Sequence, residues 1–342
     1  MGQNRPLGVV LRDLPPPVGP RDLLPARTLV EFAVLAEDLG YDSVWVPEGR
    51  GREAIALIGA MAPATARIRL ATGILPFYSR PPALVAMAAT TLADLSGGRF
   101  ILGIGAGHAA IIEGGYGLDY RDPLRAAREC IVILRQALAG GQVRVRGRIF
   151  RAETFQLESR PRHAVPIYLA ALGPRMLHLA GEVADGVVLN WATPEQVQWA
   201  AEAVREAAQM AGRDPDDVTV VAFVRVAVTE ARAAAWQVLR RLFAVYAAMP
   251  AYAHMFGAAG LSGEIMAVTA SLQTGGVDAA AAAVSGEVVE TLGLVGSAEA
   301  CREGLNRYRR AGADLVVAYP FPVGPDAKRS MRSTIEGLGP AT

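Results

Sequence analysis

Residues 68–107 read IRLATGILPFYSRPPALVAMAATTLADLSGGRFILGIGAG, and this stretch decides the fold that the sequence predicts. The run 68–74 is typical of a buried strand, 82–95 of an apolar helix, and 100–103 of a second strand that enters a glycine-rich loop. Two continuous apolar strands joined by a crossover helix indicate a right-handed βαβ unit of a parallel sheet. Both strands end in glycine and small residues, which allow a backbone to approach a flat or charged ligand closely.

The same alternation continues on both sides of this unit. Eight apolar strand candidates alternate with helices, and this pattern predicts an α/β fold, a (β/α)8 TIM barrel. The strands are expected at 7–11, 43–46, 68–74, 100–103, 167–171, 186–189, 218–226 and 314–319, and the helices at 28–39, 53–61, 82–95, 121–139, 174–184, 194–211, 297–310 and 326–338. A doubly wound open sheet is the competing fold, but it would place a glycine-rich fingerprint after the first strand, where this chain has none.

Three segments interrupt the alternation. A proline-rich loop is expected at 13–25, a small surface hairpin near 143–150, and an alanine-rich helical insertion near 230–292. We interpret residues 1–342 as a single barrel domain that carries these insertions. The helical insertion is expected to roof the pocket, and its side chains would then set substrate specificity.

Composition excludes several classes of protein. The chain has 342 residues, 52% of them hydrophobic, so it can bury a large core, and its net charge of +1 argues against a nucleic-acid surface. Its two cysteines, Cys130 and Cys301, make neither a disulfide framework nor a zinc site. We find no signal peptide and no apolar run of about 18 residues, so we expect no membrane contact and, by elimination, a cytoplasmic location.

In TIM-barrel enzymes the active-site residues lie at the carboxyl ends of the strands. These positions hold no His-x-His pair or carboxylate cluster for a metal, no lysine for a Schiff base, and no serine or cysteine with a histidine partner. They hold glycines, small apolar residues, aromatics and arginines instead, among them Arg12, Ala171, Asn190, Trp191 and Tyr319. Such a lining suits a planar organic cofactor that carries a phosphate and performs the chemistry itself.

Two turns are candidates for binding that cofactor. Gly173, Pro174, Arg175 and Met176 form a strand-to-helix turn whose N–H groups would lie at the positive end of a helix dipole, and Arg175 could add a charged donor. The glycine-rich loop 103–107 is a weaker candidate, since tight packing of a helix on a strand would explain it equally well.

Two side chains are candidates for proton transfer. His108 is the only histidine beside a strand end, and Glu48 follows the second strand. The alternatives are a partly exposed loop histidine and a solvated or helix-capping carboxylate.

The sequence resembles the luciferase-like monooxygenase superfamily, and within it the branch that uses coenzyme F420 and includes methylenetetrahydromethanopterin reductase. The resemblance rests on residues 72–107, on LAEDLGYDSVWVPE (35–48), on VPIYLAALGPRMLHLAGEVADGVVLNW (165–191) and on AGRDPDDVTVVAFV (211–224).

The resemblance implies a homodimeric enzyme with a flavin-like ring at the mouth of the barrel. A non-proline cis peptide is implied at Gly73-Ile74, behind the ring, and the phosphate is implied at Gly173 to Met176. The ring or its side chain should contact four consecutive residues, Gly105, Ala106, Gly107 and His108. The chain departs from the reductase at Val9-Val10, Glu48-Gly49 and His108, so the resemblance does not extend to a pterin substrate.

The function expected from these observations is hydride transfer between F420 and an unidentified small organic substrate, with His108 or Glu48 as the acid. An FMN-dependent two-component monooxygenase is the alternative, because the ring pocket would be shared. A barrel that binds a ligand without catalysis is the third reading.

Overall fold

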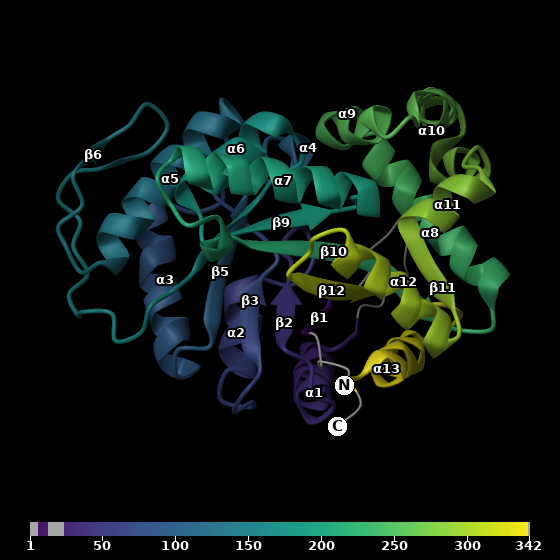
Figure 1. Cartoon of the computed structure of the whole chain (residues 1–342), viewed down its shortest axis with the longest axis horizontal. Helices are drawn as coiled ribbons and strands as arrows, with labels where there is room; N and C mark the ends of the chain where they lie inside the picture. Colours follow the sequence, from purple (N-terminus) through teal and green to yellow (C-terminus); the bar gives the residue numbers. More distant parts are fainter. Residues whose placement is uncertain (1–5, 13–23, 341–342) are drawn as a thin grey trace.

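The protein is described by a computed structural model that covers residues 6–12 and 24–340, and its centre is a closed barrel of eight parallel strands (Figure 1). The eight strands are β1 (Leu7–Val10), β2 (Ser43–Val46), β3 (Arg69–Thr72), β5 (Phe100–Gly105), β8 (Ile167–Ala170), β9 (Gly186–Asn190), β10 (Thr219–Val228) and β12 (Leu315–Pro320). The expected TIM barrel is therefore confirmed. The expected loop at 13–25 lies mostly outside the described residues.

Strand pairing shows how the barrel closes. Val9 of β1 pairs with Val44 of β2 on one side and with Ala318 of β12 on the other. At the last junction β9 pairs with β10, with Val188 opposite Val221. This pairing removes both edges that a doubly wound open sheet would have, so the competing fold is excluded.

The helices that cover the barrel start and end where local sequence signals place them. Thr193 and Gln196 form a reciprocal capping box at the start of α7, and proline occupies the first turn of α3, α5, α6 and α7. The covering helices are α1 (Ala26–Asp38), α2 (Ala54–Met61), α3 (Pro82–Leu95), α5 (Pro123–Leu138), α6 (Pro174–Val183), α7 (Pro194–Met210), α12 (Ala298–Arg310) and α13 (Ala327–Leu338). Among the described residues, no helix combines the length and the apolar character needed to cross a bilayer.

Several elements are additions to the barrel. Short strands β6 (Val145–Arg146) and β7 (Arg151–Ala152) form an antiparallel pair far from the rest of the sheet. Residues 232–292 form four helices above the carboxyl ends of the strands (Figure 1), namely α8 (Arg232–Ala247), α9 (Pro250–Ala258), α10 (Ser262–Ala282) and α11 (Gly286–Leu292). We call these four helices the roof.

Four smaller elements were not expected from the sequence: β4 (Leu75–Pro76), α4 (Ala109–Ile112), the 3-10 turn η1 (Pro215–Asp217) and β11 (Gly293–Gly296). Strand β11 pairs with the end of β10, where Val226 lies opposite Leu294. Because β10 is longer than its neighbours, its last residues extend beyond the barrel and are free to accept this extra strand.

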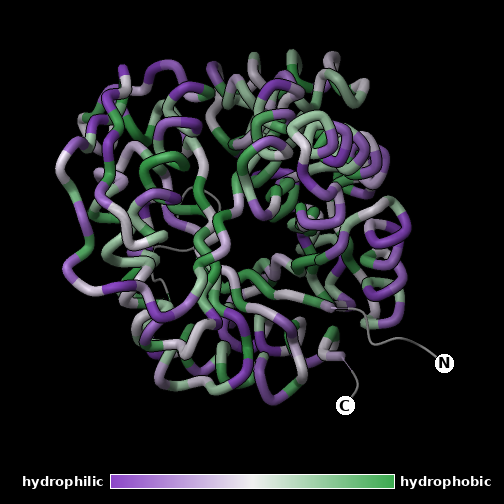
Figure 2. The backbone as a smooth tube through the Cα atoms, turned by 60° about the vertical axis from the view of Figure 1, so that its left-hand side comes forward, coloured by the Kyte–Doolittle hydropathy of each residue, from purple (hydrophilic) through white to green (hydrophobic). Residues whose placement is uncertain are grey.

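The hydrophobic core has three parts. The largest lies between the strands and the covering helices, and a second fills the barrel with side chains that include Trp45, Tyr168 and Phe223. The third lies mostly within the roof, around Phe243 and Phe256, and it also includes Trp191 and Phe321 from the barrel side. In Figure 2 the hydrophobic segments run through the middle of the molecule. The roof thus has a packed core that also contacts the strand ends, and it forms one wall of a site.

Candidate active site

A cavity of about 270 Å³ lies between the carboxyl ends of the strands and the roof. Its walls come from the ends of most barrel strands and from helices α4, α6, α8 and α9. The lining includes Arg12, Glu48, Gly73, Ile74, Pro76, Gly105, Ala106, Gly107, His108, Tyr120, Ala170, Leu172, Gly173, Met176, Asn190, Phe223, Tyr246, Tyr252 and Tyr319. The structure therefore brings together most of the cofactor-binding candidates, although Ala171, Pro174 and Arg175 do not line this cavity.

One wall of the cavity is made of backbone. The Gly73–Ile74 peptide bond that follows β3 is cis, as expected. A Cβ atom at Gly73 would lie 3.0 Å from Phe223 Cζ, and one at Gly105 would lie 3.0 Å from both Ala170 Cβ and Ile74 Cδ1. Neither position has room for a side chain, so glycine leaves this wall flat, with no side chain projecting from it.

Behind this wall, β3 and β5 are locked together by one threonine. The Thr72 hydroxyl donates to the Gly103 carbonyl at 2.7 Å and accepts from the Gly103 N–H at 2.9 Å. A Cβ atom at Gly103 would lie 2.0 Å from the Thr72 carbonyl oxygen, so only glycine permits this approach. The first half of the glycine-rich loop is thus explained by strand packing, whereas Gly105 and Gly107 face the cavity.

The start of α6 offers a backbone donor beside the cavity. Gly173 is the N-cap and contributes no side-chain cap, and its carbonyl accepts from the Met176 and Leu177 N–H groups. Within residues 6–12 and 24–340, the Arg175 N–H has no backbone acceptor. The Arg175 side chain is exposed. A free N–H at the positive end of a helix dipole is suited to an anion.

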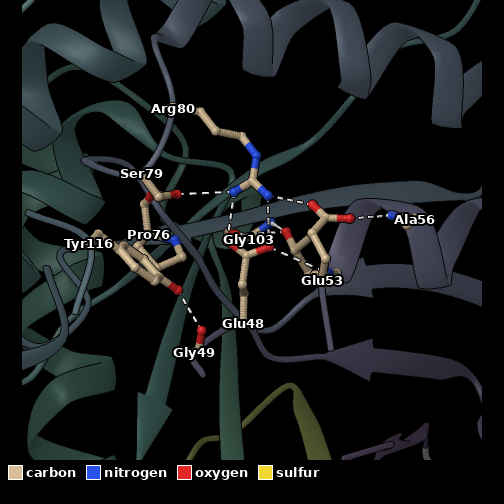
Figure 3. Close-up of polar contacts among 11 residues, drawn as sticks. Glu48, Gly49, Glu53, Ala56, Pro76, Ser79, Arg80, Gly103 and Tyr116 are labelled. Atoms are coloured by element: carbon tan, nitrogen blue, oxygen red, sulfur yellow. Dashed lines mark hydrogen bonds and ion pairs between the residues drawn. The ribbon is translucent and has the colours of Figure 1, made fainter. Parts of the chain in front are cut away.

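Glu48 lies at the cavity rim and is held by a cation (Figure 3). Its carboxylate accepts from the Arg80 guanidinium at 2.6 and 3.0 Å and from the Ala54 N–H at 3.2 Å. Arg80 also forms an ion pair with Glu53, and its side chain is 19% exposed against 5% for Glu48. The geometry therefore gives Glu48 a fixed position and a fixed charge partner.

His108 precedes α4 and lines the cavity, as its place after a strand end predicts. Its ring packs against Tyr246 and Tyr252, with centroids 5.9 and 5.8 Å away. Burial and the nearby Arg12 charge lower the His108 pKa to about 4. At neutral pH the imidazole is therefore uncharged, which suits a hydrogen-bond partner better than a proton donor.

The sequence reasoning missed a polar network at the roof side of the cavity. Arg225 is 2% exposed and donates to Asn190 Oδ1 at 2.9 Å, while Asn190 Nδ2 lies 2.6 Å from the Tyr252 hydroxyl. The Arg225 guanidinium also lies 3.7 Å from the centroid of the Tyr319 ring and 4.4 Å from that of Trp191. Arginine stacked on aromatic rings is stabilised by cation–π attraction.

One sequence signal could have revealed this network. Arg225 is the only charged residue in the apolar strand TVVAFVRVAV, and a charge at that place must have a buried partner or a function. Tyr246 and Tyr252 carry no comparable signal, because aromatic residues in an alanine-rich helical segment are equally consistent with a core.

Comparison with known proteins adds independent information. A family model described as luciferase-like monooxygenase matches residues 10–315. A 5,10-methylenetetrahydromethanopterin reductase of Archaeoglobus fulgidus is 31% identical over 306 residues, which cover 88% of this chain and 91% of that protein. An F420-dependent glucose-6-phosphate dehydrogenase of Amycolatopsis mediterranei is 32% identical over 215 residues, 58% of this chain and 63% of that protein.

Solved structures agree with the fold. The coenzyme F420 dependent tetrahydromethanopterin reductase from Methanopyrus kandleri superposes with a TM-score of 0.78 at 24% identity, over 98% of this chain and 97% of the other. Both chains therefore share the same fold.

Proposed function

The chain belongs to the luciferase-like monooxygenase family of oxidoreductases, and from that premise we propose that it transfers hydride between coenzyme F420 and a small organic substrate. The observation that carries the proposal is the flat backbone wall at Gly73 and Gly105, which faces a cavity beside the free N–H at the start of α6. The names of the curated relatives support F420 over FMN, since one of them is an F420-dependent dehydrogenase.

The residues of the cavity fit such a cofactor. The backbone at Gly73, Ile74 and Gly105 would support one face of the ring, and Gly107 and His108 would contact its edge. The turn from Gly173 to Met176 would hold the phosphate through its backbone. When bound, a deazaflavin supplies two electrons and a hydrogen as hydride, and it lacks the nitrogen with which FMN activates oxygen.

The protein's own contribution would be position and exclusion of water. The roof contributes the aromatic side chains of Tyr246 and Tyr252 to the lining of the cavity, where they exclude solvent. A low-dielectric site of this kind strengthens every electrostatic contact with the substrate. Arg80 forms an ion pair with the Glu48 carboxylate and holds it in place at the rim.

The test is a titration of purified protein with oxidised F420 and, separately, with FMN, followed by calorimetry. F420 should bind and FMN should bind at least tenfold more weakly. Tight binding of FMN with none of F420 would overturn the cofactor assignment, and oxygen consumption with reduced FMN would then favour the monooxygenase. Absence of binding by either would favour the non-catalytic barrel.

We further propose that the protein acts as a homodimer. Helix α3 presents three large apolar side chains on one face, Leu84, Met87 and Leu95, which are 48, 49 and 52% exposed. An exposed apolar stripe at helical spacing is typical of a protein–protein interface. Sedimentation equilibrium tests this proposal directly.

A further inference from the structure

Polar side chains lie across the barrel from the glycine wall. Asn190, Arg225, Tyr319 and Arg12 lie on or just beyond β9, β10, β12 and β1, which are neighbouring strands, and we call these four residues the polar row. In the closed pairing order β1, β2, β3, β5, β8, β9, β10, β12, four steps separate β3 from β10 and β5 from β12. The polar row therefore stands opposite the strands that carry the glycine wall.

The guanidinium of Arg12 lies at one end of this row, beside the cavity. Its Nη1 donates to the Tyr319 hydroxyl at 3.3 Å, and a Cβ atom at Gly49 would lie 3.7 Å from its Nη2. Arg12, Gly49 and Tyr319 all line the cavity. A guanidinium is always charged and has five N–H donors, whereas a hydroxyl accepts a hydrogen bond without supplying a counter-charge.

The protein supplies no carboxylate to balance this cation. Within residues 6–12 and 24–340, Arg12 forms no ion pair. Of the described residues that line the cavity, Glu48 alone is acidic, and Arg80 holds it at 2.6 Å. A cation beside a largely apolar cavity is stabilised when an anion enters and bonds to it. The cavity is therefore suited to a ligand that brings its own negative charge.

The phosphate proposed for the cofactor is not that charge. Its turn at the start of α6 follows β8, and β8 lies four steps from β1 in the closed pairing order. The turn and the Arg12 guanidinium are thus on opposite sides of the barrel. An anion at Arg12 must belong to a second molecule, the one that faces the ring.

The other end of the polar row also presents a hydrogen-bond donor. Arg225 has only N–H donors, so Asn190 Oδ1 is the acceptor of their 2.9 Å bond. Asn190 Nδ2 then donates to the Tyr252 hydroxyl at 2.6 Å, which leaves the Tyr252 O–H to donate to another group. Asn190 and Tyr252 both line the cavity, so a ligand with several acceptor oxygens fits the row best.

We propose that the substrate is a small organic acid whose carboxylate is bound by Arg12, and that Arg12 determines specificity for this class. The inference rests on the proposed function, since it assigns the glycine wall to the cofactor ring and the polar row to the substrate. A carboxylate matches the planar fork of a guanidinium with two parallel hydrogen bonds. The apolar part of the acid would pack on the rings of Tyr246 and Tyr252, which line the same cavity.

The experiment compares benzoate with benzamide, a neutral molecule of the same shape, as ligands of the intact protein. Calorimetric titration at neutral pH should show that benzoate binds about tenfold more tightly or better. Arg12→Gln should weaken benzoate alone and remove this preference, and Arg12→Lys should restore part of it because the charge returns. The control Arg50→Gln removes an exposed charge at the rim, outside the cavity lining, and should leave both affinities unchanged.

The wild-type comparison keeps the proposal testable if thermal unfolding shows that Arg12→Gln does not fold. The proposal is overturned if benzoate binds no more tightly than benzamide, or if Arg12→Gln keeps the preference. Arg12-dependent binding of inorganic phosphate with none of benzoate would overturn the carboxylate assignment. An equal loss of F420 and benzoate affinity in Arg12→Gln would assign the guanidinium to the cofactor instead. Arg12-dependent benzoate binding in a protein that does not bind F420 would refute the cofactor assignment and leave the carboxylate site intact.

Discussion

The most direct test of the cofactor site is a pair of substitutions at Gly173. This residue has φ −126° and ψ 164°, which any amino acid adopts, and a Cβ atom there would meet nothing within 4 Å. Gly173→Ala should therefore fold normally. Gly173→Asp should fold at least as well, because aspartate is a preferred N-cap and this helix has no side-chain cap.

The two variants should differ sharply in F420 affinity. An aspartate at the N-cap would compete for the N–H groups of the first turn, and its charge would repel the phosphate. At a separation of about 5 Å and an effective dielectric constant of about 20 to 40, that repulsion is about 2–3 kcal/mol. This energy corresponds to a loss of about 30- to 150-fold in affinity. Gly173→Ala should change the affinity less than about threefold, since it adds no charge.

Calorimetric titration with F420 measures the affinities, and thermal unfolding without ligand measures stability. A matched control is Gly263→Asp, which adds the same charge at the exposed start of α10, away from the cavity, and should leave the affinity unchanged. Raising the salt concentration should recover part of the loss in Gly173→Asp. The reasoning is refuted if Gly173→Asp binds like the wild type, or if Gly173→Ala is weakened as much.

Three further predictions concern charge, pH and assembly. Arg80→Met leaves the buried Glu48 carboxylate without its cation, so urea denaturation should show that the free energy of unfolding falls by about 3 kcal/mol. The control variant Arg332→Ala breaks an exposed ion pair and should lower it by less than about 0.5 kcal/mol. Equal losses in the two variants would contradict this prediction. Because the folded His108 pKa of about 4 lies below the unfolded value of about 6.5, the unfolded chain binds more protons between these values. Stability should therefore fall by up to about 3 kcal/mol as the pH drops from about 6.5 to 4, and His108→Gln should flatten that profile. Leu84→Asp should convert the dimer to a monomer in sedimentation equilibrium, and a monomeric wild type would disprove the interface.

The barrel was predictable because its strands are short apolar runs between glycine, proline and capped helices. Strand β11 was missed because its four residues, GLVG, lie between two helices and depend on the extra length of β10. The cis bond at Gly73–Ile74 was expected from family resemblance and not from the residues, since no local pattern distinguishes it from an ordinary turn.

The residues of the candidate site likewise differ in how far the sequence predicts their positions. Positions fixed by a strand end, such as Arg12, Gly105, His108 and Asn190, could be placed near one another once the fold was known. Tyr246 and Tyr252 could not, because their place depends on how the roof packs on the barrel, and helix periodicity does not carry that information.

The separate core of the roof has an evolutionary consequence. A segment that packs mainly on itself, around Phe243 and Phe256, can be exchanged between relatives while the glycine wall and the α6 turn stay unchanged. Such modularity would let a lineage recruit new substrates without rebuilding its redox apparatus. The exchange carries one condition: a transplanted segment must again contribute side chains that complete the lining of the cavity, as Tyr246 and Tyr252 do.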